Sequence, residues 1–276
     1  MTRQTSRWID VDHARLYVEE AGEGDAVTML HGFLVDNGQW DAEFAMLADT
    51  HHVIRYDARG FGRSIIEPGR YAHHEDLEAV LDACNVQHTA LLACSGGAAT
   101  ALDFALAHPE RVSRLIFVGA GYWGRFADST PAARAFLQAL KTLDANGLID
   151  SSLRAFTDGP RRTRDEVDPF ARQRTEAMTT RLFKRETSYW TDATSDQRTP
   201  SPSAMERLCD IDIPTVLIVG SEDQPELHAL SKELADGMPH AQMYVVHGAG
   251  HHANLEASSQ VLGLVRDALS ASAAVD

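Results

Sequence analysis

The sequence contains few cysteines and no long apolar run, and each scarcity excludes a class of protein. Its three cysteines, Cys84, Cys94 and Cys209, are too few for a disulfide framework and lack the spacing of a metal site. We therefore expect reduced thiols, no bound metal and a cytoplasmic location. No apolar run approaches the ~20 residues of a transmembrane helix, and residues 1–7 lack the apolar segment of a signal peptide.

Basic residues are also scarce. The 25 Lys and Arg residues are outnumbered by 40 Asp and Glu residues, which leaves a formal net charge of -15. This charge argues against nucleic acid or an anionic membrane as a partner. Apolar residues make up 44% of the 276 positions, enough for a sizeable core in one large α/β domain or two small ones. A monomer and a homodimer both fit this composition.

Short apolar strands alternate with helices along most of the chain. We predict strands at 8–11, 14–18, 27–30, 53–56, 89–93, 115–118, 215–219 and 243–246, with helices at 43–48, 75–84, 98–107, 227–236 and 260–269. The first two strands form a hairpin, and the alternation after them is typical of βαβ units in a parallel sheet. We therefore expect a mostly parallel eight-stranded sheet flanked by helices, whose strands are buried on both faces. Ligands then bind beyond the carboxyl ends of the strands.

The middle of the chain breaks this alternation. It predicts helices at 131–143, 150–156 and 166–190, so we expect a core of residues 1–121 and 205–276 with a helical cap, 122–204, inserted after the sixth strand. The cap carries a basic run of Arg161, Arg162, Arg164, Arg172, Arg174, Arg181, Lys184 and Arg185. This run is either a funnel for carboxylate substrates or a solvated face paired with neighbouring acids, and the pairing is favoured.

One serine lies between a predicted strand and a predicted helix. Ser95 has small residues two positions away on each side, Ala93 and Gly97, which is a nucleophile-elbow pattern with alanine in place of the first glycine. A turn this sharp strains the serine backbone, and bulky neighbours would clash across it. The hydroxyl then points away from the sheet, beside a helix N-terminus that favours negative charge.

A serine hydroxyl is a weak nucleophile and needs a base together with an acid that orients the base. The chain order typical of this elbow is serine, acid, histidine. Asp223 follows the strand 215–219 and is the predicted acid, with Glu222 as the alternative. His251 follows the last strand and is the predicted base, while we expect the adjacent His252 to point elsewhere, for instance onto the surface.

Acyl transfer also needs hydrogen-bond donors for the developing oxyanion. We predict the backbone N–H groups of Gly96 and of Phe33, the latter in the loop that follows an early strand. His31 in the same loop is expected to be a structural hydrogen-bonding residue more often than a catalyst. No metal or cofactor is needed for this chemistry.

These segments together resemble the α/β-hydrolase superfamily. The motifs are His31-Gly32-Phe33, Trp40, Asp57 to Ser64, the Ser95 elbow, His108 to Val112, Gly220 with Asp223, and Gly250-His251. In that superfamily the segment from Asp57 to Ser64 is a structural turn. A weaker similarity to the 3-oxoadipate enol-lactonase-like branch of esterases and lactonases rests on three phrases, namely Asp158 to Arg161, Val167 to Pro169, and Asn254 to Glu256.

The resemblance implies a serine hydrolase that cleaves a carboxylic ester or lactone through an acyl-enzyme. A hydrolase of C–C bonds in β-diketone-like substrates would use the same triad, and a small-molecule receptor on this fold could retain it. Dehalogenases and epoxide hydrolases are disfavoured because they need a carboxylate where Ser95 stands. We predict substrate contacts from His31, Gly32, Phe33, Trp123 and Phe126, the last two because they follow a strand end.

Overall fold

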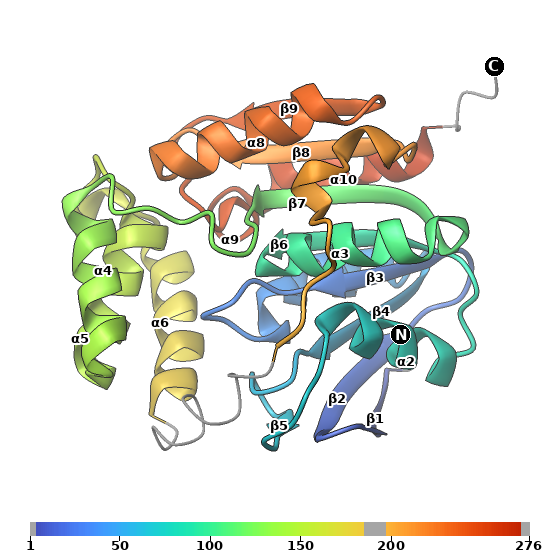
Figure 1. The fold of residues 1–276 in the computed structure, drawn as a ribbon. Coiled ribbons are helices and arrows are strands. Elements are labelled where there is room, and N and C mark those ends of the chain that lie inside the picture. Colours follow the sequence, from blue (N-terminus) through green and yellow to red (C-terminus); the bar gives the residue numbers. More distant parts are fainter. Residues whose placement is uncertain (1–3, 185–196, 272–276) are drawn as a thin grey trace.

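The computed structural model describes residues 4–184 and 197–271 (Figure 1). Its strands are β1 Thr5–Val11, β2 Ala14–Ala21, β3 Ala26–Leu30, β4 His52–Asp57, β5 Ile65–Ile66, β6 Thr89–Ser95, β7 Val112–Ala120, β8 Thr215–Gly220 and β9 Ala241–Val246. Its helices are α1 Asp41–Leu47, α2 His73–Ala83, α3 Gly96–Ala107, α4 Pro131–Thr142, α5 Ala145–Ser152, α6 Pro169–Phe183, α8 Pro225–Gly237, α9 Ala253–Glu256 and α10 Ser258–Ser270.

The strands form one sheet in the order β1-β2-β4-β3-β6-β7-β8-β9, and the two-residue β5 pairs with β2 beside this path. The hairpin β1–β2 and the pair β2–β4 are antiparallel, whereas every pair from β4 to β9 is parallel. The mostly parallel sheet of eight main strands is therefore confirmed. β5 is too short to produce a recognisable apolar run in the sequence.

Helices cover both faces of the sheet. Along β6, Leu91 and Ala93 belong to the buried cluster that includes α2, α3 and α8, whereas Leu92 and Cys94 belong to the cluster that includes α1 and α10. Successive side chains of a strand point to opposite faces, so an uninterrupted apolar run is needed where both faces are buried. This arrangement places the end of β6, and Ser95 with it, in the middle of the sheet.

The last strand departs from the expected burial on both faces. Met243, Tyr244 and Val245 in β9 each keep 39% of their surface exposed, although the sequence pattern matches that of the buried strands. β9 lies at the end of the strand order and pairs with β8 alone. An apolar run predicts a strand but does not indicate whether the strand has neighbours on both sides.

The inserted helices α4, α5 and α6 lie side by side at one end of the sheet, where the β7 arrow ends (Figure 1). The predicted helix 150–156 is instead the end of α5 followed by a π-helical turn, Leu153–Asp158. α6 ends at Phe183, and the rest of the predicted helix 166–190 falls largely outside the described residues. Among the described helices, none combines the length and the apolar character that a membrane crossing requires.

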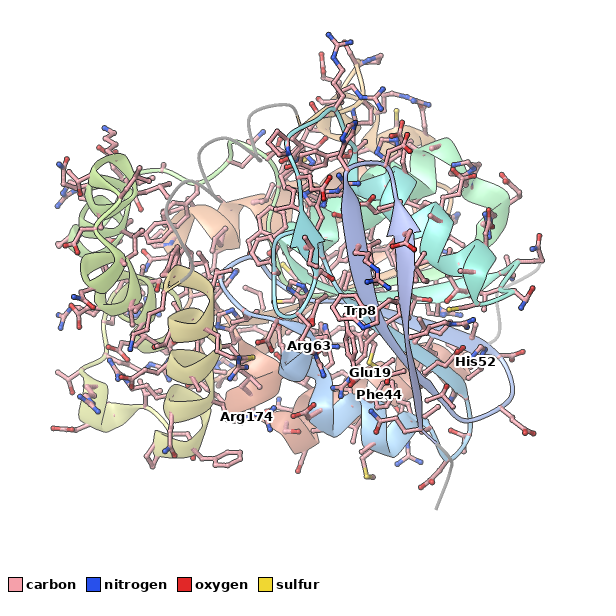
Figure 2. The ribbon with its side chains drawn as sticks, turned by 90° about the horizontal axis from the view of Figure 1, so that it is seen from below. Trp8, Glu19, Phe44, His52, Arg63 and Arg174 are labelled. Atoms are coloured by element: carbon pink, nitrogen blue, oxygen red, sulfur yellow. The ribbon has the colours of Figure 1, made fainter. Side chains whose placement is uncertain are left out.

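Arginines attach the inserted helices to the core. The ion pairs join Arg161 to Glu222 at 3.0 Å, and Arg162 to Glu256, Arg174 to Asp41 and Arg181 to Asp36 at 2.6 Å each. In Figure 2, Arg174 lies between α6 and the core helices. Arg172 pairs with acids of the insertion itself, Asp158 at 2.8 Å and Glu176 at 3.6 Å. Most of the partners are thus core carboxylates rather than acids of the insertion, and Arg185 lies outside the described residues.

Candidate active site

Ser95 occupies the turn between β6 and α3. Its backbone has φ 49° and ψ -121°, a left-handed value of φ that is unusual for a residue with a side chain. A Cβ on Gly97 would come within 2.5 Å of the Leu30 carbonyl, and one on Gly121 would come within 2.9 Å of the Ser95 carbonyl carbon. Small residues are therefore required around Ser95, and the turn presents its half-buried side chain beside the N-terminus of the twelve-residue α3.

His251 and Asp223 come from loops that follow neighbouring strands, β9 and β8. The ring Nδ1 of His251 lies 2.8 Å from Oδ2 of Asp223, and each residue is 2% exposed. The other carboxylate oxygen of Asp223 accepts the backbone N–H of Gln224 at 2.7 Å. The structure thus holds one histidine nitrogen against a buried carboxylate, which fixes the orientation of the ring.

Glu222, the alternative acid, has other partners. Its carboxylate accepts hydrogen bonds from Arg161 at 3.0 Å and from the Ser221 hydroxyl at 2.9 Å. The hydrogen bond from Arg161 is the main reason that the pKa of Glu222 lies below its usual value. Of the two candidate acids, only Asp223 reaches the His251 ring.

The end of β7 makes room for both the histidine and the serine. Gly119 has φ 58°, and a Cβ there would lie 2.4 Å from the His251 carbonyl oxygen and 2.9 Å from its Nδ1. Two residues later, Gly121 donates its N–H to the Ser95 carbonyl at 3.2 Å. Two residues on one strand end therefore contact His251 and Ser95 respectively.

The second ring nitrogen of His251, Nε2, is buried and has no hydrogen-bond partner among the described residues, Ser95 included. Buried polar atoms without partners are uncommon and call for an explanation. In a serine–histidine pair, this nitrogen is the one that takes the hydroxyl proton, and such hydrogen bonds often tighten only when substrate is bound. The predicted base, His251, is therefore oriented by Asp223, and its Nε2 has no hydrogen-bond partner among the described residues.

The predicted oxyanion donors come from adjacent segments. A Cβ on Gly96 would contact the Phe33 ring at 2.8 Å, and one on Gly32 would lie 3.2 Å from the Ser95 Cβ. Phe33 N–H has no backbone hydrogen-bond acceptor within residues 4–184 and 197–271. As the first residue of α3, Gly96 has no intrahelical acceptor for its own N–H.

His31 holds the loop that carries Phe33. Its Nδ1 lies 2.7 Å from the Gly32 carbonyl oxygen, and its Nε2 lies 2.9 Å from the Ala58 backbone nitrogen, which donates to it. Both ring nitrogens are thereby engaged by backbone groups, in keeping with a structural role. The substrate contacts predicted for His31 and Gly32 stay predictions, and any contact from His31 would come from the carbon edge of its ring.

Aromatic side chains surround this site. The Phe33 ring centroid lies 5.2 Å from that of Trp123, whose indole N–H donates to Asp103 at 3.0 Å. Phe126 lies 5.0 Å from Phe156, and Phe156 in turn lies 5.3 Å from the His251 ring. Trp123 therefore adjoins the predicted oxyanion loop, while Phe126 is separated from the His251 ring by the ring of Phe156.

Sequence reasoning missed how the insertion holds the loop of the predicted base. The Phe156 carbonyl, in the π-helical turn, accepts the His251 backbone N–H at 3.1 Å. Glu256 accepts the Gly250 N–H at 2.8 Å and also pairs with Arg162 of the insertion. The sequence around Arg161 and Glu256 indicates only the family resemblance, because nothing in the spacing of these segments shows that they lie together.

The expected surface position of His252 is wrong. This residue is 2% exposed, its ring lies 5.2 Å from that of His251, and neither of its nitrogens has a partner among the described residues. Burial lowers the pKa of His252 to about 3, with the adjacent His251 as a lesser cause. Cys94 is fully buried, and burial raises the pKa of its thiol to about 12.

Comparisons with known proteins agree with this fold. The family model described as the α/β hydrolase fold matches residues 25–258. A 2-hydroxy-6-oxononadienedioate/2-hydroxy-6-oxononatrienedioate hydrolase from Cupriavidus pinatubonensis is 26% identical, over 96% of this chain and 95% of that protein. The solved structure of Est816, described as an N-acyl homoserine lactone degrading enzyme, is 27% identical with a TM-score of 0.72, over 95% of this chain and 99% of that one. The enol-lactonase from Burkholderia xenovorans shares the fold, with a TM-score of 0.78 at 20% identity over 96% of this chain and 100% of that one.

Proposed function

Because the chain belongs to the α/β-hydrolase fold family and is a hydrolase, we propose that it cleaves a carboxylic ester or lactone with Ser95 as its nucleophile. The observations that carry this proposal are the buried pair of His251 and Asp223, in which Nε2 of the histidine has no hydrogen-bond partner among the described residues, and the strained turn that carries Ser95. A base with one nitrogen held by a carboxylate is what a serine hydroxyl needs in order to attack a carbonyl carbon.

In the proposed reaction, Ser95 Oγ attacks the carbonyl carbon as His251 Nε2 takes its proton. Asp223 stabilises the imidazolium that forms, and the N–H groups of Phe33 and Gly96 donate to the developing oxyanion. His251 then gives the proton to the leaving alcohol oxygen, which produces an acyl-enzyme. A water molecule, deprotonated by the same histidine, attacks the acyl carbon, and the histidine returns this proton to the leaving Ser95 Oγ as the acid is released.

The inserted segment, residues 122–204, acts in this proposal as a cap over the site, on a core of residues 1–121 and 205–276. Its π-helical turn supplies the carbonyl that binds the His251 N–H, and its first residues supply Trp123 beside Phe33. A cap of this kind places apolar rings around the scissile bond and limits access of water.

An uncharged substrate fits the cap better than a dianionic one. Within the basic run, Arg161, Arg162, Arg174 and Arg181 are each paired with a core carboxylate, and Arg172 is paired with Asp158. These five cations are thus already neutralised and would have to leave a partner in order to bind a substrate carboxylate. The rings around the site favour an apolar acyl or alcohol group, with Trp123 and Phe126 as proposed contacts.

Hydrolysis of a C–C bond is the second candidate function. It is favoured by the curated relatives, since several of them, at 25 to 26% identity over about nine-tenths of this chain, are named as 2-hydroxy-6-oxononadienedioate hydrolases. The same serine, histidine and aspartate would serve, but the leaving group would be a carbon acid rather than an alcohol.

A substrate panel on the wild type and Ser95→Ala tests both candidates. The panel contains esters and lactones of graded size and one vinylogous diketone, and Ser113→Ala on the exposed part of β7 is the matched control. We expect ester or lactone turnover that falls by up to ~10⁶-fold in Ser95→Ala, the loss measured when a comparable triad serine is removed. Turnover of the diketone alone would select the second candidate, and near-normal turnover by Ser95→Ala would reject both.

A further inference from the structure

Three buried ligand groups meet directly beneath the proposed nucleophile. One ligand atom from each of Cys94, His251 and His252 lies within 4.8 Å of the other two, and all three residues are buried. Their exposures are 0%, 2% and 2%. Cys94 is the last residue before Ser95, and its side chain points to the sheet face that α1 and α10 cover.

Most of the ring nitrogens in this cluster have no hydrogen-bond partner among the described residues. Nε2 of His251 and both ring nitrogens of His252 are buried without a hydrogen-bond partner among the described residues. A buried imidazole costs free energy when its nitrogens are unpaired, because it has lost its hydrogen bonds to water. A neutral imidazole has one N–H and one lone pair, so each of the two rings offers one lone pair beside the Cys94 sulfur, and a ligand that accepts lone pairs would satisfy them.

We propose that Cys94, His251 and His252 form a binding site for Zn²⁺ that inhibits the enzyme. One sulfur and two imidazole nitrogens are a ligand set that Zn²⁺ takes, with distances of about 2.3 Å to sulfur and about 2.0 Å to nitrogen, so the cluster has to contract slightly around the ion. Binding breaks the S–H bond of Cys94 and forms a Zn–S bond, and the released proton goes to water. The fourth position of a tetrahedral ion stays available to water.

Coordination of His251 removes the base whichever nitrogen is used. Nε2 is the atom that would take the proton from Ser95, and Nδ1 is the atom that Asp223 holds. The sequence did not predict this site, because its ligands come from two segments more than 150 residues apart and the two histidines are adjacent in the chain. Adjacent side chains rarely share one ion, and here the loop after β9 brings both rings beside Cys94.

Equilibrium dialysis of the metal-free protein against Zn²⁺ tests the site without reference to activity. We expect one Zn²⁺ per chain in the wild type and in Ser95→Ala. Cys94→Ala and His252→Phe should each weaken binding by more than the ~10–100-fold that loss of an outer-shell partner costs. Cys84→Ala, at another buried cysteine, is the matched control and should bind like the wild type.

Two further measurements complete the test. Cd²⁺ added to the wild type should produce an ultraviolet thiolate-to-metal charge-transfer band that is absent in Cys94→Ala. Zn²⁺ should inhibit wild-type turnover with the midpoint found by dialysis, and this result alone depends on the proposed function. The site is refuted if the wild type binds no Zn²⁺ at concentrations of Zn²⁺ up to the millimolar range, or if Cys94→Ala and His252→Phe bind it as tightly as the wild type.

Discussion

Glu43 in the first turn of α1 provides a test of the structure that is independent of any assumed activity. Its side chain is fully buried, and burial raises its pKa from 4.5 to about 7. The charge of Arg174 lowers this pKa by less than burial raises it, and neither carboxylate oxygen of Glu43 has a hydrogen-bond partner among the described residues. Glu43 is therefore protonated in the folded protein at a pH where the unfolded chain carries it as a carboxylate.

The sign and size of the effect follow from this difference. Between pH 4.5 and about 7 the folded state holds a proton that the unfolded state has lost, so the free energy of unfolding falls as the pH rises. A shift of ~2.5 pKa units at ~1.36 kcal/mol per unit gives a loss of about 3 kcal/mol across this range. Below pH 4.5 the stabilisation is fully present, and above pH 7 no further loss occurs.

Urea unfolding of the wild type and Glu43→Gln at several pH values between 4.5 and 8 measures this loss. Because glutamine does not titrate, Glu43→Gln should gain about 3 kcal/mol relative to the wild type as the pH rises from 4.5 to 7. The exposed Glu23→Gln is the control and should follow the wild type. A difference between the wild type and Glu43→Gln that stays constant over this range would refute the reasoning.

Two other predictions concern the proposed base and its acid. Asp223→Asn should fold normally and lower kcat by about 10⁴-fold, because the amide favours the wrong tautomer of the ring, whereas Glu222→Gln should retain most activity in the same ester assay. Gly119→Ala should lower both kcat and the urea midpoint, because its Cβ would lie 2.4 Å from the His251 carbonyl oxygen in a backbone conformation with φ 58°. The control is Gly263→Ala in α10, where a Cβ meets nothing within 4 Å and should raise the free energy of unfolding by about 1 kcal/mol. Equal effects of the two glycine substitutions would contradict the packing described around His251.

The parts of the fold that the sequence predicted are those with a local cause. The apolar runs of β6 and β8, and the small residues around Ser95, are dictated by burial on two faces and by the sharp turn itself. Asp223 and His251 could be selected because each follows a strand, and strand ends in a parallel sheet meet at one edge. The 2.8 Å contact between these two residues agrees with that selection.

The features that were missed depend on contacts between distant segments. The exposure of β9 follows from its place at the end of the strand order, which its own residues do not encode. The burial of His252 follows from the path of the loop after β9, and a polar side chain gives no sign of being buried. The partners of the basic run could not be predicted either, because Asp36 and Asp41 lie far from Arg181 and Arg174 in the chain.

Glu256 restricts which insertions could replace the segment between residues 121 and 205. Its Oε1 accepts the Gly250 backbone N–H, and Arg162 donates to both of its carboxylate oxygens, so the same side chain contacts the His251 loop and the inserted segment. A chimaera that grafts a foreign insertion between residues 121 and 205 would leave this acid without its cation. A grafted insertion should therefore keep an arginine at the position of Arg162, so that Glu256 retains its ion-pair partner.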